Sequence, residues 1–204
     1  MQLDLSDFSS SERYHLMTQT IIPRPIAWAL TDSGNSSYNL APFSYFTAVS
    51  SQPALLMLSI GKKGNGENKD TLTNILNNKK MVIHIASNEQ AELVTQTAKT
   101  LAHGESEIVY SGLTTTDFEG FSLPRLSDCD VAFGCELYEV KQLGGAQQAL
   151  VFVEIKQLYI NDRVVSKDAK ERLKIDASKI SPLARLGGGE YAAIADPFTL
   201  QRPD

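Results

Sequence analysis

The sequence predicts a mainly β protein with a few helices, of the α+β class, built on an antiparallel barrel that is closed or partly closed. Three observations favour this fold class. About six segments have the length and apolar content of β-strands, and helical patterns fall between only some of them. The spacing of these segments does not suit a parallel, doubly wound sheet. The length of 204 residues is enough for one domain with a substantial core.

The N-terminal part of the predicted fold contains one hairpin. A Ser- and Asp-rich arm over residues 1–10 precedes a segment, 12–17, that can form one or two helical turns. A buried-strand pattern over 26–30 is followed by turn residues at 32–35. Because Asp, Ser, Gly and Asn favour tight turns, we expect a hairpin into a second strand at 38–40.

The next predicted strand and helix lie on either side of a Gly- and Lys-rich loop. Seven mostly apolar residues, 54–60, predict a central strand. The loop that follows ends at Asp70, a residue type that caps helix N-termini well. Apolar side chains then recur at helical spacing, at Leu72, Ile75 and Leu76.

The middle of the chain predicts a further strand and a capped helix. Residues 81–86 return as a strand. Ser87 and Gln90 form a capping-box pattern, which predicts a helix over about 88–99. The glycine-punctuated segment 103–125 predicts mostly loop with short strand pieces.

Two long strands are predicted in the second half of the chain. Residues 131–140 and 150–160 have strand patterns and are linked through the glycines at 144–145, so we expect antiparallel neighbours. Beyond Asp162 the sequence predicts a polar turn and a short helix. The glycines at 187–189 then give the backbone unusual freedom.

Composition argues against several classes of function. A net charge of −5 disfavours nucleic-acid binding, which needs a basic surface. Prolines and polar residues interrupt the apolar segments, which disfavours a membrane span. The first residues do not resemble a secretory signal, and we interpret Cys129 and Cys135 as reduced, half-buried strand residues, with a disulfide or metal site as the alternative. We therefore expect a cytoplasmic protein without a metal site.

Familiar catalytic motifs are incomplete. The glycines at 61 and 66 have the first spacing of a P-loop, but Glu67 stands where the lysine is required. Residues 104–108 lack the last glycine of a nucleophile elbow, and no dinucleotide-binding glycine motif follows a strand. We interpret His84 as a barrel-facing or interface residue, and His103 as a loop residue that can line a site.

The most informative feature is an uncharged stretch that ends in a cationic helix start. No residue from Ser33 to Gly61 carries a charge, so this stretch must lie inside a fold or against something apolar. Lys69, Asp70 and Thr71 then open a helix, whose first N–H groups attract anions. An uncharged wall beside a cationic helix start suits a ligand with a flat aromatic part and an anionic tail.

Several short motifs carry a resemblance to a known family. The chain resembles the flavin reductase-like, FMN-binding split-barrel family, in the branch that contains flavoredoxins. The resemblance covers about residues 23–203, so we divide the chain into an N-terminal arm and short helix, 1–22, and one split-barrel domain, 23–204. The matching motifs are Pro-Arg-Pro-Ile-Ala-Trp at 23–28, Asn-Leu-Ala-Pro-Phe-Ser-Tyr-Phe at 39–46, Ser-Ile at 59–60, Lys-Asp-Thr at 69–71, Gly-x-x-Glu at 104–107, and the segment from Pro182 to Tyr191.

The resemblance implies a homodimer of split barrels, with FMN in a cleft near the subunit interface. It also implies that the flavin performs the redox chemistry, so that no catalytic residue or metal is needed from the protein. NAD(P)H would supply electrons, and a small molecule, free flavin or a partner protein would accept them. A rival interpretation is an FMN-binding electron carrier that a partner protein reduces. A third is a split barrel with another ligand, such as haem or a deazaflavin.

The resemblance assigns the FMN phosphate to the start of the predicted helix. Lys69 supplies a charge and Thr71 a hydroxyl, while Asp70 is expected to cap the helix. Asn39 can reach the edge of the flavin ring, because a carboxamide both donates and accepts hydrogen bonds.

Other matched residues are assigned to the flavin ring and its side chain. Ala41, Phe43 and Ser44 would contribute backbone amides to N5 and the pyrimidine edge of the ring, because Pro42 stiffens this loop and has no N–H of its own. Tyr45 packs on the ring or fills the core, and Ser59 reaches the ribityl or phosphate oxygens or ends a strand. The predicted cofactor-binding residues are Asn39, Ala41, Phe43, Ser44, Tyr45, Ser59, Ile60, Lys69, Asp70 and Thr71.

Some matched residues have open roles. Trp28, the only tryptophan, can fill the core, and Arg24 has no assigned partner. Arg185 and Tyr191, together with the glycines at 187–189, either close over the cleft or pack against a second subunit.

Overall fold

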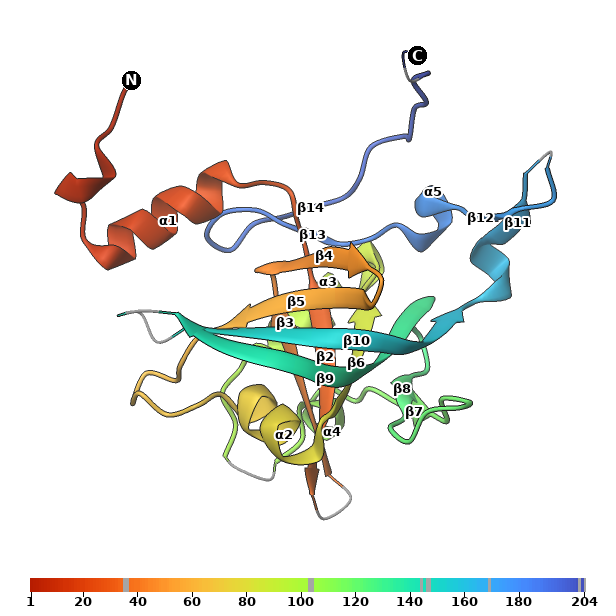
Figure 1. The fold of residues 1–204 in the computed structure, drawn as a ribbon, viewed down its shortest axis with the longest axis horizontal. Coiled ribbons are helices and arrows are strands. Elements are labelled where there is room, and N and C mark those ends of the chain that lie inside the picture. The colour runs from red at the N-terminus through yellow and green to blue at the C-terminus, as the bar shows by residue number, and fades with distance from the viewer. Residues whose placement is uncertain are drawn as a thin grey trace.

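The computed structural model describes residues 1–34, 37–102, 105–143, 145, 148–168, 170–201 and 203. Within these residues, seven strands form an antiparallel sheet in the order β3-β2-β6-β9-β10-β5-β4, and the sheet curls into a barrel (Figure 1). This confirms the predicted fold class. The strands are β2 (Ala27–Gly34), β3 (Ser37–Phe43), β4 (Phe46–Ser51), β5 (Ala54–Ile60), β6 (Lys80–Ile85), β9 (Val131–Leu143) and β10 (Gln148–Ile160).

Shorter elements decorate the barrel. Three small sheets accompany it. The first joins β1 (Arg24–Pro25), β13 (Ala184–Arg185) and β14 (Tyr191–Ala192) in that order, the second joins β7 (Thr115–Thr116) and β8 (Arg125–Leu126), and the third joins β11 (Val165–Lys167) and β12 (Leu173–Ile175). The helices are α1 (Ser10–Thr20), α2 (Asp70–Asn78), α3 (Ala91–Gln96), α4 (Glu107–Tyr110) and α5 (Ala177–Ile180), with 3-10 turns at Leu5–Asp7, Asn88–Gln90 and Asp162–Val164. In Figure 1, α1 and the β13–β14 hairpin lie on one side of the barrel, and α2 and α4 lie on the other. In the part of the chain that the structure describes, no helix has the length and apolar character to cross a membrane.

The barrel is split between its two edge strands, β3 and β4. They stand at opposite ends of the strand order, and no ladder joins them among the described residues. They are nevertheless consecutive in sequence, because β3 ends at Phe43 and β4 begins at Phe46. The chain crosses between the two edges through Ser44 and Tyr45. The Tyr45 carbonyl accepts a hydrogen bond from the Ser59 N–H at 2.8 Å, which fixes the crossover on β5.

Two apolar clusters fill the two faces of the sheet. Side chains that alternate along β2 separate them: Ala27 and Ala29 face the barrel interior, and Trp28 and Leu30 face outward. The interior cluster includes Leu58 of β5 and is extended by apolar side chains of α2. The outer cluster lies under α3, α4 and the loops that follow them. Because both faces of the first half of β2 are buried, residues 27–30 form a continuous apolar run.

Several predicted elements have the expected place. The hairpin of residues 26–40 is the β2–β3 pair, and β9 and β10 are antiparallel neighbours. Trp28 is fully buried and its Nε1–H donates to the Thr97 hydroxyl at 2.9 Å, so it fills the core as expected. The capping box of Ser87 and Gln90 is present.

Other expectations are corrected. The helix after Ser87 is a 3-10 turn followed by the short α3, which ends at Gln96 rather than near residue 99. The strand 54–60 is β5, which lies next to the edge strand β4 and not at the centre of the sheet. The strand β4 itself was not predicted, because its sequence lacks a clear alternation.

Two further corrections concern single residues. Lys69, not Asp70, is the N-cap of α2, and no side chain caps this helix. Cys129 and Cys135 are free thiols that are buried rather than half-buried, and only Cys135 lies in a strand. Burial raises the pKa of the Cys129 thiol to about 12, so this thiol is not a reactive group at neutral pH.

His84 links three strands inside the protein. Its Nε2 accepts a hydrogen bond from the Leu126 N–H at 2.9 Å, which requires the proton to be on Nδ1. Nδ1 lies 3.0 Å from the Trp28 carbonyl and therefore donates to it. The side chain is fully buried, and burial lowers the pKa of His84 to about 4. His84 is thus a neutral structural residue. It faces the outer cluster, because it alternates along β6 with Ile83 of the interior cluster and contacts Leu126 of the outer one, so the barrel-facing interpretation was wrong.

This geometry predicts that His84 makes stability depend on pH. The unfolded chain takes up a proton near pH 6.5, whereas the folded protein does so only near pH 4. His84 therefore contributes stability that is present above pH 6.5 and lost as pH falls toward 4, by up to about 3 kcal/mol. We expect His84→Gln to be less stable at pH 7 and the gap from the wild type to narrow with falling pH, measured by urea unfolding. A gap that stays constant between pH 7 and 4 would contradict this assignment.

Candidate functional site

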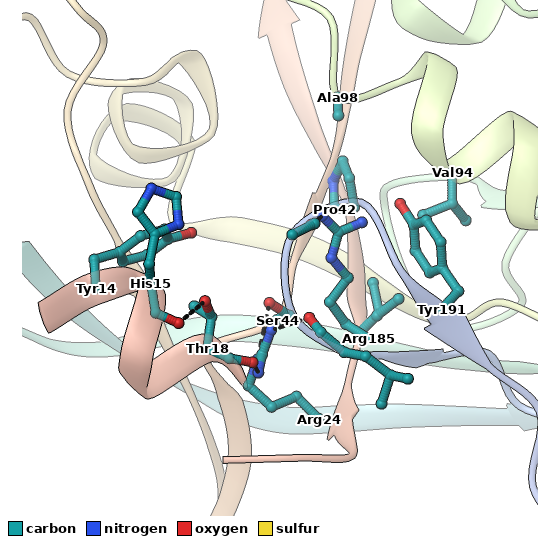
Figure 2. Close-up of a pocket in the computed structure, with 13 residues that line it drawn as sticks. Tyr14, His15, Thr18, Arg24, Pro42, Ser44, Val94, Ala98, Arg185 and Tyr191 are labelled. Carbon is teal, nitrogen blue, oxygen red and sulfur yellow. Dashed lines mark hydrogen bonds between the residues drawn. The ribbon is translucent and has the colours of Figure 1, made fainter. Parts of the chain in front are cut away.

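Two adjoining cavities lie along the split of the barrel and share Pro42 and Ala98 as a common wall. We call the first the lysine cleft; it is about 320 Å³ in volume. The second, the arginine pocket, is about 250 Å³ (Figure 2). The lysine cleft is lined by Asn39, Ala41, Pro42, Phe43, Lys62, Lys63, Gly64, Lys69, Asp70, Thr71, Thr97, Ala98, Lys99, Thr100 and Glu107. The arginine pocket is lined by Tyr14, His15, Thr18, Arg24, Ile26, Pro42, Ser44, Val94, Ala98, Arg185, Leu186, Gly188 and Tyr191.

A tight loop between β5 and α2 builds one wall of the lysine cleft. The Lys63 N–H donates to the Glu67 carbonyl at 2.8 Å, and the Gly66 N–H donates to the Lys63 carbonyl at 2.9 Å. Gly66 has a φ of 85°, a left-handed conformation that a glycine adopts without strain. The loop therefore brings the chain back to the cleft, where α2 begins at Asp70.

The four lysines of the cleft differ in their partners. Lys63 forms an ion pair with Asp70 at 2.8 Å, and Lys62 donates to the Asn68 side chain. Lys99 donates to the Tyr110 hydroxyl at 3.1 Å. Lys69, in contrast, has no hydrogen-bond or ion-pair partner for its ammonium group among the described residues.

Lys69 is therefore a cation that lacks an anion. Its ammonium group lies 5.6 Å from the centre of the Phe43 ring, and burial lowers the pKa of this group. A positive charge that is partly removed from water without a counter-ion is costly, and an anionic ligand would relieve that cost. Lys69 is also the N-cap residue of α2, so its ammonium group belongs to the start of that helix, which is the positive end of the helix dipole.

Two buried polar contacts hold α2 on strands β3 and β2. Asn39 donates from Nδ2 to the Thr71 hydroxyl at 2.9 Å, and both residues are almost fully buried. Since the Thr71 oxygen accepts this bond, its own proton is available to a ligand. Asn74 of α2 donates to the Thr31 hydroxyl at 3.1 Å, which holds the helix on β2.

Glu107 forms the acidic wall of the lysine cleft and was missed as a site residue. Its carboxylate accepts a hydrogen bond from the Leu40 N–H at 2.9 Å, at the free edge of β3. Burial raises the pKa of the Glu107 carboxyl, although this hydrogen bond opposes the shift. The Gly-x-x-Glu motif was the signal that could have placed it in the site.

The Leu40 contact also orients the neighbouring backbone groups. Alternate residues of an edge strand point their amides toward the sheet and away from it. The Leu40 N–H points away from β2, so the N–H groups of Ala41 and Phe43 point toward β2. Pro42, between them, has no N–H. Ala41 and Phe43 therefore face the cleft without offering these amides to a ligand.

The structure gathers most of the predicted cofactor-binding residues along this split. Six line the lysine cleft, and Ser44 lines the arginine pocket. Tyr45 lies in the crossover, with its ring 6.2 Å from that of Tyr14, and Ser59 donates to the Gln148 side chain at 3.3 Å. Ile60 is fully buried in the barrel interior. These three line neither cavity. The six in the lysine cleft are Asn39, Ala41, Phe43, Lys69, Asp70 and Thr71. His103 lies outside the described residues.

The arginine pocket lies between α1, the end of β3 and the β13–β14 hairpin (Figure 2). At its floor, the Arg24 guanidinium donates to the carbonyls of Thr18 and Ile21, at 2.6 and 2.7 Å, and to that of Leu186 at 2.7 Å. It also reaches the Ser44 hydroxyl at 3.4 Å. Arg24 thus ties the two ends of the chain to the crossover of the barrel.

Together, the fold and the site define a split β-barrel with a cleft along its open edge, in which the Lys69 ammonium group has no anionic partner among the described residues. The family model described as "Flavin reductase like domain" matches residues 17–174, and the chain belongs to this family. Its members are flavin-binding proteins, and the family suggests an oxidoreductase. The resemblance inferred from the sequence motifs is therefore confirmed.

Similar proteins extend over the whole chain. An uncharacterised protein of Halalkalibacterium halodurans is 31% identical, over 100% of this chain and 97% of its own. The crystal structure of nitrilotriacetate monooxygenase component B from Bacillus cereus has a TM-score of 0.88 at 29% identity, covering 98% of each chain. That of Pseudomonas fluorescens 2-nitrobenzoate 2-nitroreductase NbaA has a TM-score of 0.87 at 26% identity, covering 100% of this chain and 96% of its own.

Proposed function

We propose that the protein is an FMN-dependent oxidoreductase that passes electrons from NAD(P)H, through the bound flavin, to a small acceptor, free flavin or a partner protein. The observation that carries the proposal is the unpaired Lys69 ammonium at the start of α2, inside a cleft that adjoins a second cavity. Family membership supports a flavin, and two solved relatives are named as a monooxygenase component and a nitroreductase. Two buried, free cysteines are consistent with the cytoplasm, where we place the protein.

The residues of the lysine cleft fit a phosphate-bearing flavin. Lys69, the Thr71 hydroxyl and the N–H groups of the α2 start would hold the phosphate. The uncharged end of β3 and the shared wall at Pro42 would face the flat ring system. When bound, the flavin supplies the hydride and electron chemistry, which agrees with the absence of a complete catalytic motif in the sequence.

The first prediction concerns the phosphate. Lys69→Ala should weaken FMN far more than riboflavin, which lacks the phosphate. A charge-assisted contact is worth about 1.5–3 kcal/mol, so the loss should be roughly 10- to 150-fold in FMN affinity. Thr71→Val should show the same selectivity at smaller size, because a neutral hydroxyl contributes less. Titration calorimetry or flavin fluorescence quenching measures both affinities, and the Lys69 effect should shrink as salt rises.

The chain offers a matched control for this measurement. Lys141 lies 5.8 Å from the centre of the Phe152 ring, much as Lys69 lies over Phe43, but it lines neither cavity. Lys141→Ala should leave FMN affinity unchanged. Lys69→Ala should fold as stably as the wild type without ligand, since its ammonium group has no ion pair among the described residues to lose. Equal losses for FMN and riboflavin would place the phosphate elsewhere.

The second prediction concerns the electron donor. Anaerobic mixing of the FMN-loaded protein with NADH or NADPH should bleach the visible absorbance of the flavin. Comparing the rates with the two nucleotides gives the preference between them. If neither nucleotide bleaches a flavin that dithionite does reduce, the protein is an electron carrier reduced by a partner. If the purified protein binds no added FMN, the proposed function is wrong.

We also propose that the protein is a homodimer that uses the outer edge of β4. This strand is uncharged and mostly exposed, and its outer edge pairs with no strand among the described residues. Val49, near its middle, is 47% exposed. Monomeric proteins usually protect an exposed, uncharged edge strand. We therefore infer that a second subunit covers the edge of β4.

The dimer predicts a mass in solution of twice the 22.4 kDa of one chain. Val49→Lys should shift the protein toward monomer, because a buried interface disfavours an unpaired charge. Light scattering at several concentrations measures both species. A wild-type monomer that still binds FMN would show that the site does not need a second subunit.

A further inference from the structure

The arginine pocket has the chemistry of a binding site in its own right. One side is apolar and is made by Ile26, Pro42, Val94 and Ala98. The other side carries hydroxyl, imidazole and guanidinium groups (Figure 2). A volume of about 250 Å³ lies just below the range of pockets for drug-sized ligands, so it suits a one-ring molecule rather than a dinucleotide.

The charged side chains among the described lining residues of this pocket are all positive. Among its described lining residues there is no aspartate or glutamate, whereas two arginines contribute positive charge. The lysine cleft differs, since Asp70 and Glu107 line it together with its lysines. An anion in the arginine pocket would therefore meet no carboxylate on the walls.

The two arginines of the pocket have different tasks. Arg24 is almost fully buried and uses its guanidinium for three backbone carbonyls and the Ser44 hydroxyl. Arg185 is half-buried, and its one hydrogen-bond partner among the described residues is the Gly188 carbonyl. Its other N–H donors are therefore available to a ligand.

Arg185 is also held in position. Its guanidinium lies 4.5 Å from the centre of the Tyr191 ring, across the β13–β14 pair that sets these two residues opposite each other. The Tyr191 hydroxyl in turn accepts from the Thr95 hydroxyl of α3 at 3.0 Å. In Figure 2 the Arg185 side chain points into the pocket toward Pro42. A planar guanidinium fixed in this way is suited to a bidentate contact with a carboxylate.

We propose that the arginine pocket binds a planar, one-ring carboxylate, with its ring against the apolar wall and its carboxylate on Arg185. Because Pro42 and Ala98 belong to both cavities, such a ligand would lie next to whatever fills the lysine cleft. This binding rests on the pocket alone and does not depend on the proposed function. It also gives Arg185, Gly188 and Tyr191 a role within one chain, as residues that line the pocket.

The test uses the purified protein and 4-fluorobenzoate, followed by fluorine NMR, with 4-fluorobenzamide as the uncharged probe of the same shape. We expect the carboxylate to bind and the amide to bind at least about 10-fold more weakly, as a charge-assisted contact predicts. Arg185→Gln should reduce carboxylate binding by a similar factor and leave amide binding unchanged. Arg185→Lys should recover part of the loss, because it restores the charge without the planar fork.

Arg125→Gln is the matched control, because Arg125 is likewise stacked on a tyrosine, 3.5 Å from the centre of the Tyr159 ring, but lies outside the pocket. It should bind 4-fluorobenzoate as the wild type does. Equal binding of the two probes, or no effect of Arg185→Gln in a variant with a native circular dichroism spectrum, would overturn the proposal. Displacement of 4-fluorobenzoate by ADP would also overturn it, because the anion held by Arg185 would then be the diphosphate of a nucleotide.

The binding test is independent of the flavin test. The fluorine signal reports occupancy of the pocket whether or not FMN is bound. If Lys69→Ala leaves FMN affinity unchanged while Arg185→Gln weakens 4-fluorobenzoate binding, the placement of the flavin is wrong and the carboxylate site is supported. If Lys69→Ala weakens FMN binding while Arg185→Gln leaves 4-fluorobenzoate binding unchanged, only the carboxylate site is wrong.

Discussion

The two-residue crossover at Ser44 and Tyr45 is the constraint on which the rest of the structure depends. In a flat sheet, the edge strands β3 and β4 would stand six strand spacings apart, about 29 Å at the usual spacing. The chain from Phe43 to Phe46 reaches at most about 10 Å. The sheet must therefore curl until its edges meet at this corner. The curl creates the interior that Leu58 and the side chains of α2 fill, and it leaves the barrel open along the rest of the split.

The two edge strands beside this split differ in how their outer backbone groups are paired. On β3, the Ser106 hydroxyl donates to the Tyr38 carbonyl at 2.6 Å, and Glu107 accepts from the Leu40 N–H. Side chains of α4 thus satisfy an edge that would otherwise invite another strand. The β4 edge has no such cover among the described residues. One edge consequently forms a wall of the lysine cleft, and the other remains exposed.

The sequence was informative where local chemistry decides the structure and less so where distant contacts do. The hairpin at residues 26–40 was predictable, because turn residues and apolar runs are local signals. The candidate site at Lys69 followed from a motif beside a helix start, and Lys69 does line the lysine cleft. The prediction that Asp70 caps α2 was wrong. Its carboxylate pairs instead with Lys63, through a contact across a loop that local sequence does not reveal. Glu107 and the pocket at Arg185 depend on segments far apart in sequence, so only the folded structure brings them to the split.

The Arg24 network also has a consequence for the order in which the chain matures. This guanidinium donates to the carbonyls of Thr18 and Ile21 and to the carbonyl of Leu186, which is synthesised after all seven strands of the barrel. Because domains generally fold as the ribosome releases them, the barrel strands can pair while the docking of α1 waits for its last partner. Helix α1 therefore docks only after the segment around Leu186 has been synthesised, and the arginine pocket beside it is completed in the same step.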